Sequence, residues 1–149
     1  MPWLKEISMN LQSCRPEGTP WISPYVIVSN VDKAADFYVN AFGFSKVHTI
    51  AGEDGSTWHA EMKYQDHLIM FGKSGSYGGK TQSPTESKID SPINLYLYCE
   101  NVDEFFQHAI KMGAKALSEP EDTFWNDRMC RLQDPEGYIW CFATYLGEK

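Results

Sequence analysis

The chain has 149 residues, a net charge of −7 at pH 7 and a hydrophobic content of 42%. This length supports one domain with a sizeable core, and the abundance of aromatic residues excludes intrinsic disorder. The negative charge, which no Lys or Arg cluster offsets, argues against nucleic acid as a partner.

No apolar stretch approaches the ~20 residues that are needed to span a bilayer. Residues 1–20 carry no secretory signal and predict a polar arm containing Pro and Gly. We therefore expect a cytoplasmic protein without a membrane partner.

The first module is expected at residues 21–73, in the order strand, helix, strand and hairpin. Asn30 is a good N-cap, and apolar residues at helical spacing predict a helix that ends at Gly43. Gln65 and Asp66 form the turn of the hairpin. The expected strands are 22–28, 44–50, 57–64 and 67–72, and the expected helix is 31–42. Residues 74–91 are rich in Gly, Ser, Thr and Lys and predict a linker.

The second module is expected at residues 92–149 and repeats this order. Asn101 and Glu104 resemble a capping box, and Gly113 ends the helix that follows. Asp134-Pro135-Glu136-Gly137 predicts a type I turn with Gly137 in the left-handed region as a G1 bulge. The expected strands are 93–99, 115–117, 128–133 and 138–145.

The two modules share a sequence repeat, because Asn30-Val31-Asp32 recurs as Asn101-Val102-Asp103. Two copies indicate a duplicated βαβββ unit. Each unit has a sheet with one face covered by its helix, and the other face needs a partner. We expect an α+β fold in which two βαβββ modules form a cupped, incomplete mixed β-barrel with the helices outside.

Several motifs appear in this frame. They are Ile22–Val28, Asp36-Phe37-Tyr38 with Ala41-Phe42-Gly43, and Asp134–Tyr138 with Trp140. In this order they resemble the vicinal oxygen chelate superfamily, which includes glyoxalase I, extradiol dioxygenases and the bleomycin- and fosfomycin-resistance proteins. Three further motifs look like its PhnB-like branch: Arg15–Gly18, His59-Ala60-Glu61 and Pro120–Arg128. The resemblance implies the same cupped fold, usually in a homodimer, and covers about residues 15–145.

The resemblance also marks four positions where metal-dependent members carry His, Gln or Glu ligands. In this chain those positions are Ser23, Met70, Asn94 and Cys141. They are a poor set for hard divalent ions, which prefer carboxylate, imidazole and water. We therefore predict no metal with the family geometry and no cofactor. The cysteines lack a Cys-x-x-Cys pair, so we expect buried free thiols.

Strand alternation predicts which side chains line the cup. The hairpin turns pair Glu61 with Met70 and Arg131 with Cys141, and Asp127 shares the latter face. Trp125 and Arg128 lie on a loop near the mouth and either gate the site or contact a second subunit. The candidate ligand-binding residues are Tyr25, Met70, Asn94, Tyr96, Tyr98, Trp125, Arg128, Arg131 and Cys141.

His59 and Glu61 are the candidate catalytic residues, because they lie two apart on one strand and can transfer a proton. The alternative is that Glu61 forms an ion pair with Arg131.

Three functions remain open. The first is binding of a small amphipathic molecule, including a cationic one, in the cup. The second is a metal-independent lyase or isomerase that uses His59 and Glu61, or a metal-dependent glyoxalase-type enzyme with ligands from elsewhere. The third is an interaction or regulatory role for a protein with a collapsed cup.

Overall fold

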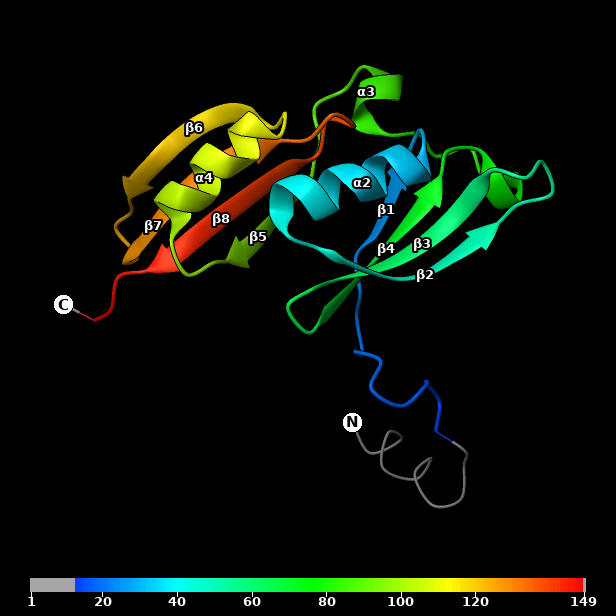
Figure 1. Ribbon diagram of the computed structural model, residues 1–149, viewed down its shortest axis with the longest axis horizontal. Coiled ribbons are helices and arrows are strands. Elements are labelled where there is room, and N and C mark those ends of the chain that lie inside the picture. The colour runs from blue at the N-terminus through cyan, green and yellow to red at the C-terminus, as the bar shows by residue number, and fades with distance from the viewer. Residues whose placement is uncertain (1–12, 149) are drawn as a thin grey trace.

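Two four-stranded sheets and two long helices make up the computed structural model, which describes residues 13–148 (Figure 1). The predicted arm lies mostly outside these residues, and its described part, residues 13–20, holds no helix or strand. Among the residues described, no helix has the length and apolar character to cross a membrane.

The first module is built as its sequence predicts. The sheet order is β1-β4-β3-β2, with β1 parallel to β4 and the other pairs antiparallel. Asn30 Oδ1 accepts a hydrogen bond from Lys33 N at the start of α2, and Gly43 ends the helix at φ 72°. The elements are β1 (Tyr25–Val28), α2 (Val31–Phe42), β2 (Ser45–Ala51), β3 (Thr57–Tyr64) and β4 (His67–Lys73).

The second module repeats this topology with the order β5-β8-β7-β6. Asn101 Oδ1 accepts from Glu104 N and begins the helix. Gly137 adopts φ 91° in the closing turn, which confirms the predicted left-handed position. The elements are β5 (Asn94–Tyr98), α4 (Val102–Lys111), β6 (Lys115–Asp122), β7 (Asp127–Gln133) and β8 (Ile139–Tyr145).

Two segments of the linker and the second module differ from the prediction. The linker contains η1 (Ser76–Gly78) and α3 (Pro84–Ser87), the latter with a capping box between Ser83 and Glu86. Such short turns have no periodicity that a sequence pattern can reveal. β6 continues to Asp122 instead of ending at Leu117, since an edge strand tolerates Pro120 and register shifts.

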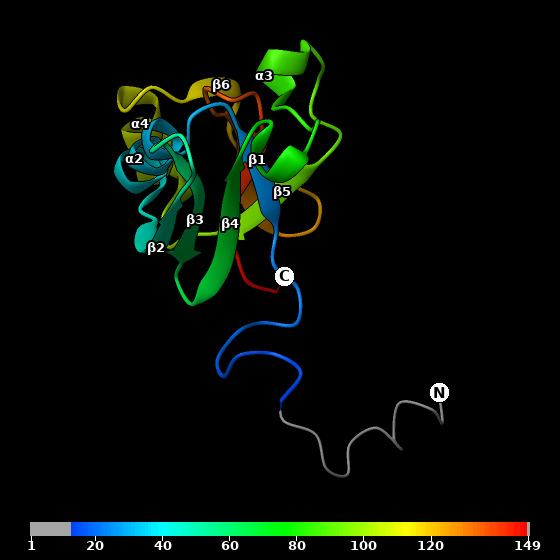
Figure 2. The ribbon, with the colours of Figure 1, turned by 90° about the vertical axis from the view of Figure 1, so that its right-hand side faces the viewer.

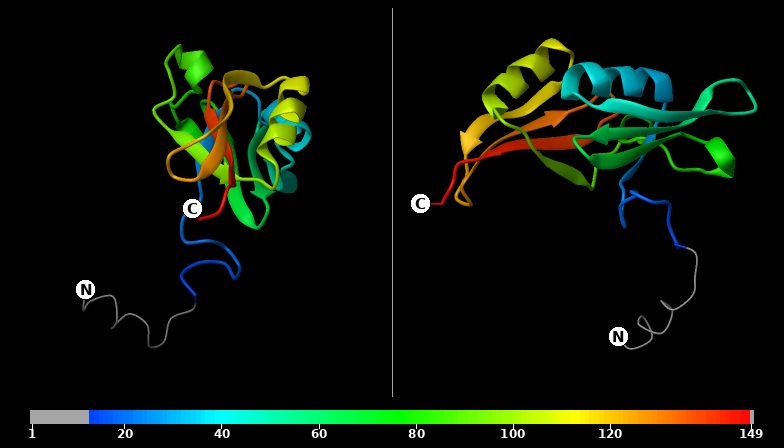
Figure 3. Two further views of the ribbon diagram at one scale, coloured as in Figure 1. Left: turned by 90° about the vertical axis from the view of Figure 1, so that its left-hand side faces the viewer. Right: turned by 60° about the horizontal axis from the view of Figure 1, so that its bottom comes forward.

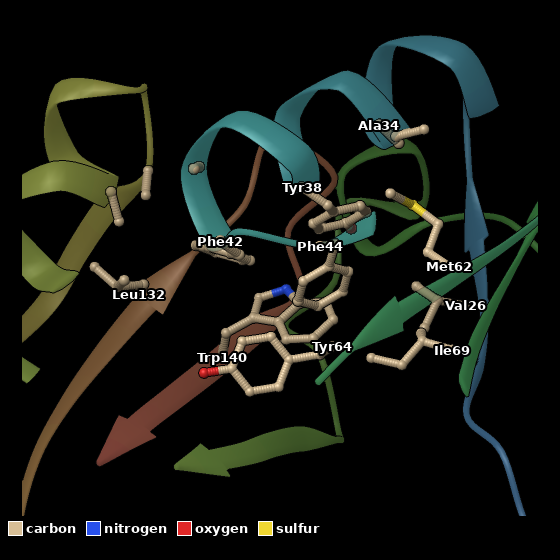
Figure 4. Packing of buried hydrophobic residues seen from close by; sticks show 14 of the residues in the cluster. Val26, Ala34, Tyr38, Phe42, Phe44, Met62, Tyr64, Ile69, Leu132 and Trp140 are labelled. Atoms are coloured by element: carbon tan, nitrogen blue, oxygen red, sulfur yellow. The ribbon is translucent and has the colours of Figure 1, made fainter. Parts of the chain in front are cut away.

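The two modules share one hydrophobic core beneath their helices. α2 and α4 lie on the same side of the sheets, end to end along the molecule (Figures 1 and 3). Phe105 of α4 packs on Phe142 of β8, with ring centroids 4.0 Å apart. Tyr38 and Trp140, from different modules, meet at 5.3 Å in the centre of this core (Figure 4).

Polar contacts also cross the junction between the modules. Tyr138 Oη donates to Ile27 O at 2.7 Å, and the Glu136 carboxylate accepts from the backbone N and the hydroxyl of Ser29. Tyr64 Oη donates to Tyr98 O at 2.8 Å. The modules therefore pack as one unit.

The expected α+β fold of two βαβββ modules is confirmed, and its sheets do not close into a barrel. Each sheet buries one face under the helices and leaves the other uncovered (Figures 2 and 3). Tyr25, Tyr96 and Tyr98 on the uncovered faces are 49%, 42% and 56% exposed. Within residues 13–148, therefore, the two modules do not enclose a shared cup.

Candidate functional site

The strand registers place the predicted side chains on the uncovered faces. Glu61 pairs with Met70 and Arg131 pairs with Cys141, which confirms both predicted registers. The two-residue turn and the G1-bulge turn set these registers. Burial also fixes them, because a slip of one residue would expose the buried side chains of each strand. We call these two uncovered surfaces the open faces.

The open face of the first sheet carries a row of polar groups formed by Tyr25, His59 and Glu61. Tyr25 Oη lies 3.1 Å from His59 Nδ1, and His59 Nε2 lies 3.7 Å from Glu61 Oε1. Burial is the largest cause that raises the pKa of Tyr25, and the electrostatic effect of Tyr77 adds to it. These three groups can accept, hold or pass on a proton at the surface of the sheet.

Gly72 makes room for this row. A Cβ at Gly72 would lie 2.6 Å from Cε1 of Tyr25, so only glycine lets the tyrosine ring lie across β4. The signal in the sequence is a glycine within a predicted strand, which often marks such a close approach.

The alternative prediction of a Glu61–Arg131 ion pair is wrong, as no such pair forms among the described residues. Glu61 belongs to the first sheet and Arg131 to the second, and the two sheets do not face each other.

The open face of the second sheet carries a carboxylate surrounded by aromatic donors. Tyr96 Oη, Tyr98 Oη and Trp125 Nε1 donate to Asp127 Oδ2 at 2.6, 3.0 and 3.1 Å. Asp127 is 1% exposed, while the three aromatic residues are 42–56% exposed. We call these four residues the Asp127 cluster. Strand alternation predicts Asp127 on this face, but no local pattern indicates that three donors converge on it.

The loop before β7 positions Trp125 in this cluster. Thr123 Oγ1 donates to Asp127 O and accepts from Asp127 N, and Thr123 N also donates to Asp127 O at 2.7 Å. Asn126 takes a left-handed conformation at φ 67°, which Asn tolerates better than most residues. The closed loop turns Trp125 back over the sheet and leaves Phe124 93% exposed at the tip.

The environment of the Asp127 cluster keeps its phenols neutral. Burial is the largest cause that raises the pKa of Tyr96 to about 12, and its hydrogen bond to Asp127 adds to this. The pKa of Tyr98 is raised first by its hydrogen bond to Asp127 and then by burial. Both hydroxyls therefore remain donors at neutral pH.

Arg128 points to the helix side of the sheet and not to the open face. Its Nε and Nη2 bind the carboxylate of Asp103 at 2.7 and 2.9 Å, and its Nη1 binds Asp122 Oδ1 at 2.9 Å. These contacts connect α4, β6 and β7. We leave Arg128 out of the site proposed below.

The four positions at which the resemblance places metal ligands hold side chains that do not suit a hard cation. Ser23, Met70, Asn94 and Cys141 offer one hydroxyl, one amide and two sulfur groups, without a carboxylate. Burial raises the pKa of the Cys141 thiol, although Arg131 lowers it. Within residues 13–148, no group of three or more His, Cys, Asp and Glu side chains could hold a metal ion.

The prediction of buried thiols holds for Cys130 and Cys141, and all four cysteines are free. It is wrong for Cys14, which is exposed on the segment before β1, and Cys99 is half-buried.

A groove of about 510 Å³ lies where the two modules meet, between β5 and the β3–β4 hairpin. Tyr96 and Tyr98 line this groove and also belong to the Asp127 cluster. The other lining residues are mainly apolar, among them Tyr64, Leu68, Ile69, Leu95 and Leu97. No local sequence pattern could have revealed the groove, because its walls come from both modules.

Comparison with known proteins extends over most of the chain. Residues 20–142 match the model of the Glyoxalase/Bleomycin resistance protein/Dioxygenase superfamily. An uncharacterized protein of Mycobacterium tuberculosis (strain H37Rv) is 33% identical over 131 residues, which cover 87% of this chain and 76% of that protein. A bleomycin resistance protein of Staphylococcus aureus is 25% identical over 128 residues, which cover 83% and 95% of the two chains.

Solved structures share the fold. TioX from Micromonospora sp. ML1 aligns with a TM-score of 0.64 and 24% identity over 84% of this chain and 99% of its own. The bleomycin resistance determinant encoded on transposon Tn5 aligns with a TM-score of 0.61 and 21% identity, over 85% of this chain and 98% of its own. The family match, which spans most of both modules, shows that the chain belongs to the Glyoxalase/Bleomycin resistance protein/Dioxygenase superfamily.

Proposed function

We propose that this chain is a binding protein that holds a small amphipathic molecule against the open faces of its sheets. The observation that carries this proposal is the Asp127 cluster, where Tyr96, Tyr98 and Trp125 stay about half exposed around a buried carboxylate. Ligand sites typically combine apolar and aromatic walls with a few converging polar groups. The similarity to a bleomycin resistance protein supports a binding role. The motifs that resemble the PhnB-like branch do not indicate which ligand is bound.

We include a homodimer in this proposal. Each open face carries partly exposed apolar side chains, such as Ile27 and Met70 on the first sheet, which a second copy would cover. In a two-fold dimer, the first sheet of one chain can face the second sheet of its partner, and the pairing then forms two equivalent cups.

A thermal-shift screen tests the binding function. The screen uses glycopeptides and aromatic amphiphiles, both neutral and cationic. We expect at least one of these compounds to raise the melting temperature of the protein. A ligand present at 100 times its Kd stabilises the fold by about 2.7 kcal/mol. Tyr96→Ala should reduce this shift, whereas Tyr77→Ala, at a more exposed tyrosine outside the Asp127 cluster, should retain it. The proposal is wrong if no compound shifts the transition or if both variants respond alike.

The row of Tyr25, His59 and Glu61 favours a second candidate, a metal-independent lyase or isomerase. His59 lies between a phenol and a carboxylate, as in a general base held in position by its neighbours. We expect such an enzyme to exchange the α-protons of small hydroxyketones for deuterium in D₂O, as followed by NMR. His59→Asn and Glu61→Gln should each lower this rate at least 100-fold. Glu53→Gln, in an exposed turn, is the control, and equal rates in all variants would exclude the assignment.

A further inference from the structure

The Asp127 carboxylate is buried without a positive partner among residues 13–148. It is 1% exposed, and its hydrogen bonds from Tyr96, Tyr98 and Trp125 all end on Oδ2. None of the ion pairs formed within residues 13–148 involves Asp127. Three neutral donors on one oxygen leave the negative charge of the carboxylate without a counter-charge.

The arginines of β7 do not supply that charge. Arg128 is engaged by Asp103 and Asp122 on the helix side of the sheet. Arg131 lies opposite Cys141 in the β7–β8 pairing and forms no ion pair with Asp127. Buried carboxylates are normally paired with a cation because removing an unpaired charge from water is costly. The missing charge can therefore come from a ligand.

The aromatic residues around Asp127 suit a cation of a particular kind. Tyr96 and Tyr98 meet edge to face at 5.7 Å, and both rings are about half exposed. Trp125 closes the third side, and its Nε1 also donates to Tyr96 Oη at 3.2 Å. The electron-rich faces of such rings attract organic ammonium groups, which lose less hydration than a metal ion when they bind.

The groove between the modules supplies a second, independent feature. Tyr96 and Tyr98 form part of its wall, so that the groove adjoins the Asp127 cluster directly. Its volume of about 510 Å³ falls in the range of sites for drug-sized molecules, and its other walls include Leu68, Leu95 and Leu97. A charged head at Asp127 and an apolar body in the groove would belong to the same molecule.

We propose that the Asp127 cluster and the adjoining groove form a site for an organic cation, with an ammonium head against Asp127, Tyr96, Tyr98 and Trp125 and an apolar body between the modules. This inference rests on the proposed binding function and names the chemical class of its ligand.

Isothermal titration calorimetry with two matched probes tests the site. Benzyltrimethylammonium carries the cation, and neopentylbenzene has the same shape without the charge. We expect the cation to bind at least tenfold more tightly, and its affinity to fall as NaCl is raised. Asp127→Asn should weaken the cation at least tenfold and leave the neutral probe unchanged. Asp122→Asn, an exposed carboxylate of the same sheet, should affect neither probe.

Trp125→Leu provides a second variant in case Asp127→Asn fails to fold, since Trp125 lies on the loop and is 46% exposed. It should weaken the cation and remove the change in tryptophan fluorescence that binding causes. Equal affinity for both probes, or unchanged cation binding in these variants, would overturn the cation site and leave the binding function intact. If neither probe binds, the cation site is excluded, and the thermal-shift screen decides separately on the binding function.

Discussion

Asp134 joins the two modules through a single carboxylate. Its Oδ2 accepts from Tyr38 Oη at 2.6 Å and from Trp140 Nε1 at 2.8 Å, and its Oδ1 accepts from the backbone N of Glu136 and Tyr138. Burial raises the pKa of Asp134, and these four hydrogen bonds oppose that rise. The sequence predicted Asp134 only as the first residue of a turn. Its contact with α2 of the other module depends on tertiary packing.

Removing one donor should reveal the strength of this connection. Tyr38→Phe takes away the hydroxyl and leaves a buried carboxylate with one donor fewer, so we expect a loss of about 1–3 kcal/mol in the free energy of unfolding. Tyr145→Phe is the matched control, because Tyr145 is 55% exposed and its hydroxyl makes no hydrogen bond within residues 13–148. Urea unfolding of both variants measures the difference, and equal stabilities would show that the contact contributes nothing.

At the scale of elements, local sequence accounts for most of the structure. α2 matches its predicted range of 31–42, because Asn30 caps its start and Gly43 ends it at positive φ. The hairpin β3–β4 follows its prediction to within one residue, since its turn contains only Gln65 and Asp66. β1 is shorter than predicted and begins at Tyr25. Pro24 still accepts a hydrogen bond from Met70 N of β4, but a proline has no N–H to donate in return.

The turn before β8 combines two constraints in one glycine. Gly137 adopts φ 91°, and a Cβ there would lie 2.9 Å from Thr85 Oγ1 on α3. We expect Gly137→Ala to destabilise the fold by about 1–3 kcal/mol, from backbone strain and the clash together. Gly147→Ala is the control with a similar φ of 89° but with nothing within 4 Å. Urea unfolding measures the free energy of unfolding of both variants. A smaller loss in Gly147→Ala would show the part that comes from the clash with Thr85, and equal losses would rule out a contribution from α3.

At the scale of the whole molecule, the two modules meet along their helices, where Phe42 of α2 stacks on Phe105 of α4, and residues 13–148 leave the open faces uncovered (Figure 3). The βαβββ pattern predicts that each sheet needs a partner for the face that its helix does not cover. Among residues 13–148, the observed packing does not provide that partner. This arrangement motivates the proposed homodimer.

Light scattering coupled to size-exclusion chromatography tests that assembly. We expect a mass of twice the 17.0 kDa chain. Ile27→Lys, on the open face of β1, should shift the equilibrium to monomer because the proposed contact would then bury a charge. Val39→Lys, on the outer side of α2, should leave the mass unchanged. The dimer would be contradicted if the unsubstituted chain were a monomer at micromolar concentration. It would also be contradicted if Ile27→Lys kept the same mass as Val39→Lys.

The sequence by itself determined the repeat, the caps and the strand registers. Each of these depends on residues close together in the chain or on a regular alternation. Tertiary structure decided that Arg131 does not meet Glu61, that three donors converge on Asp127, and that an apolar groove adjoins that cluster. These features depend on how segments far apart in the sequence pack, and only the shared core beneath the helices sets that packing.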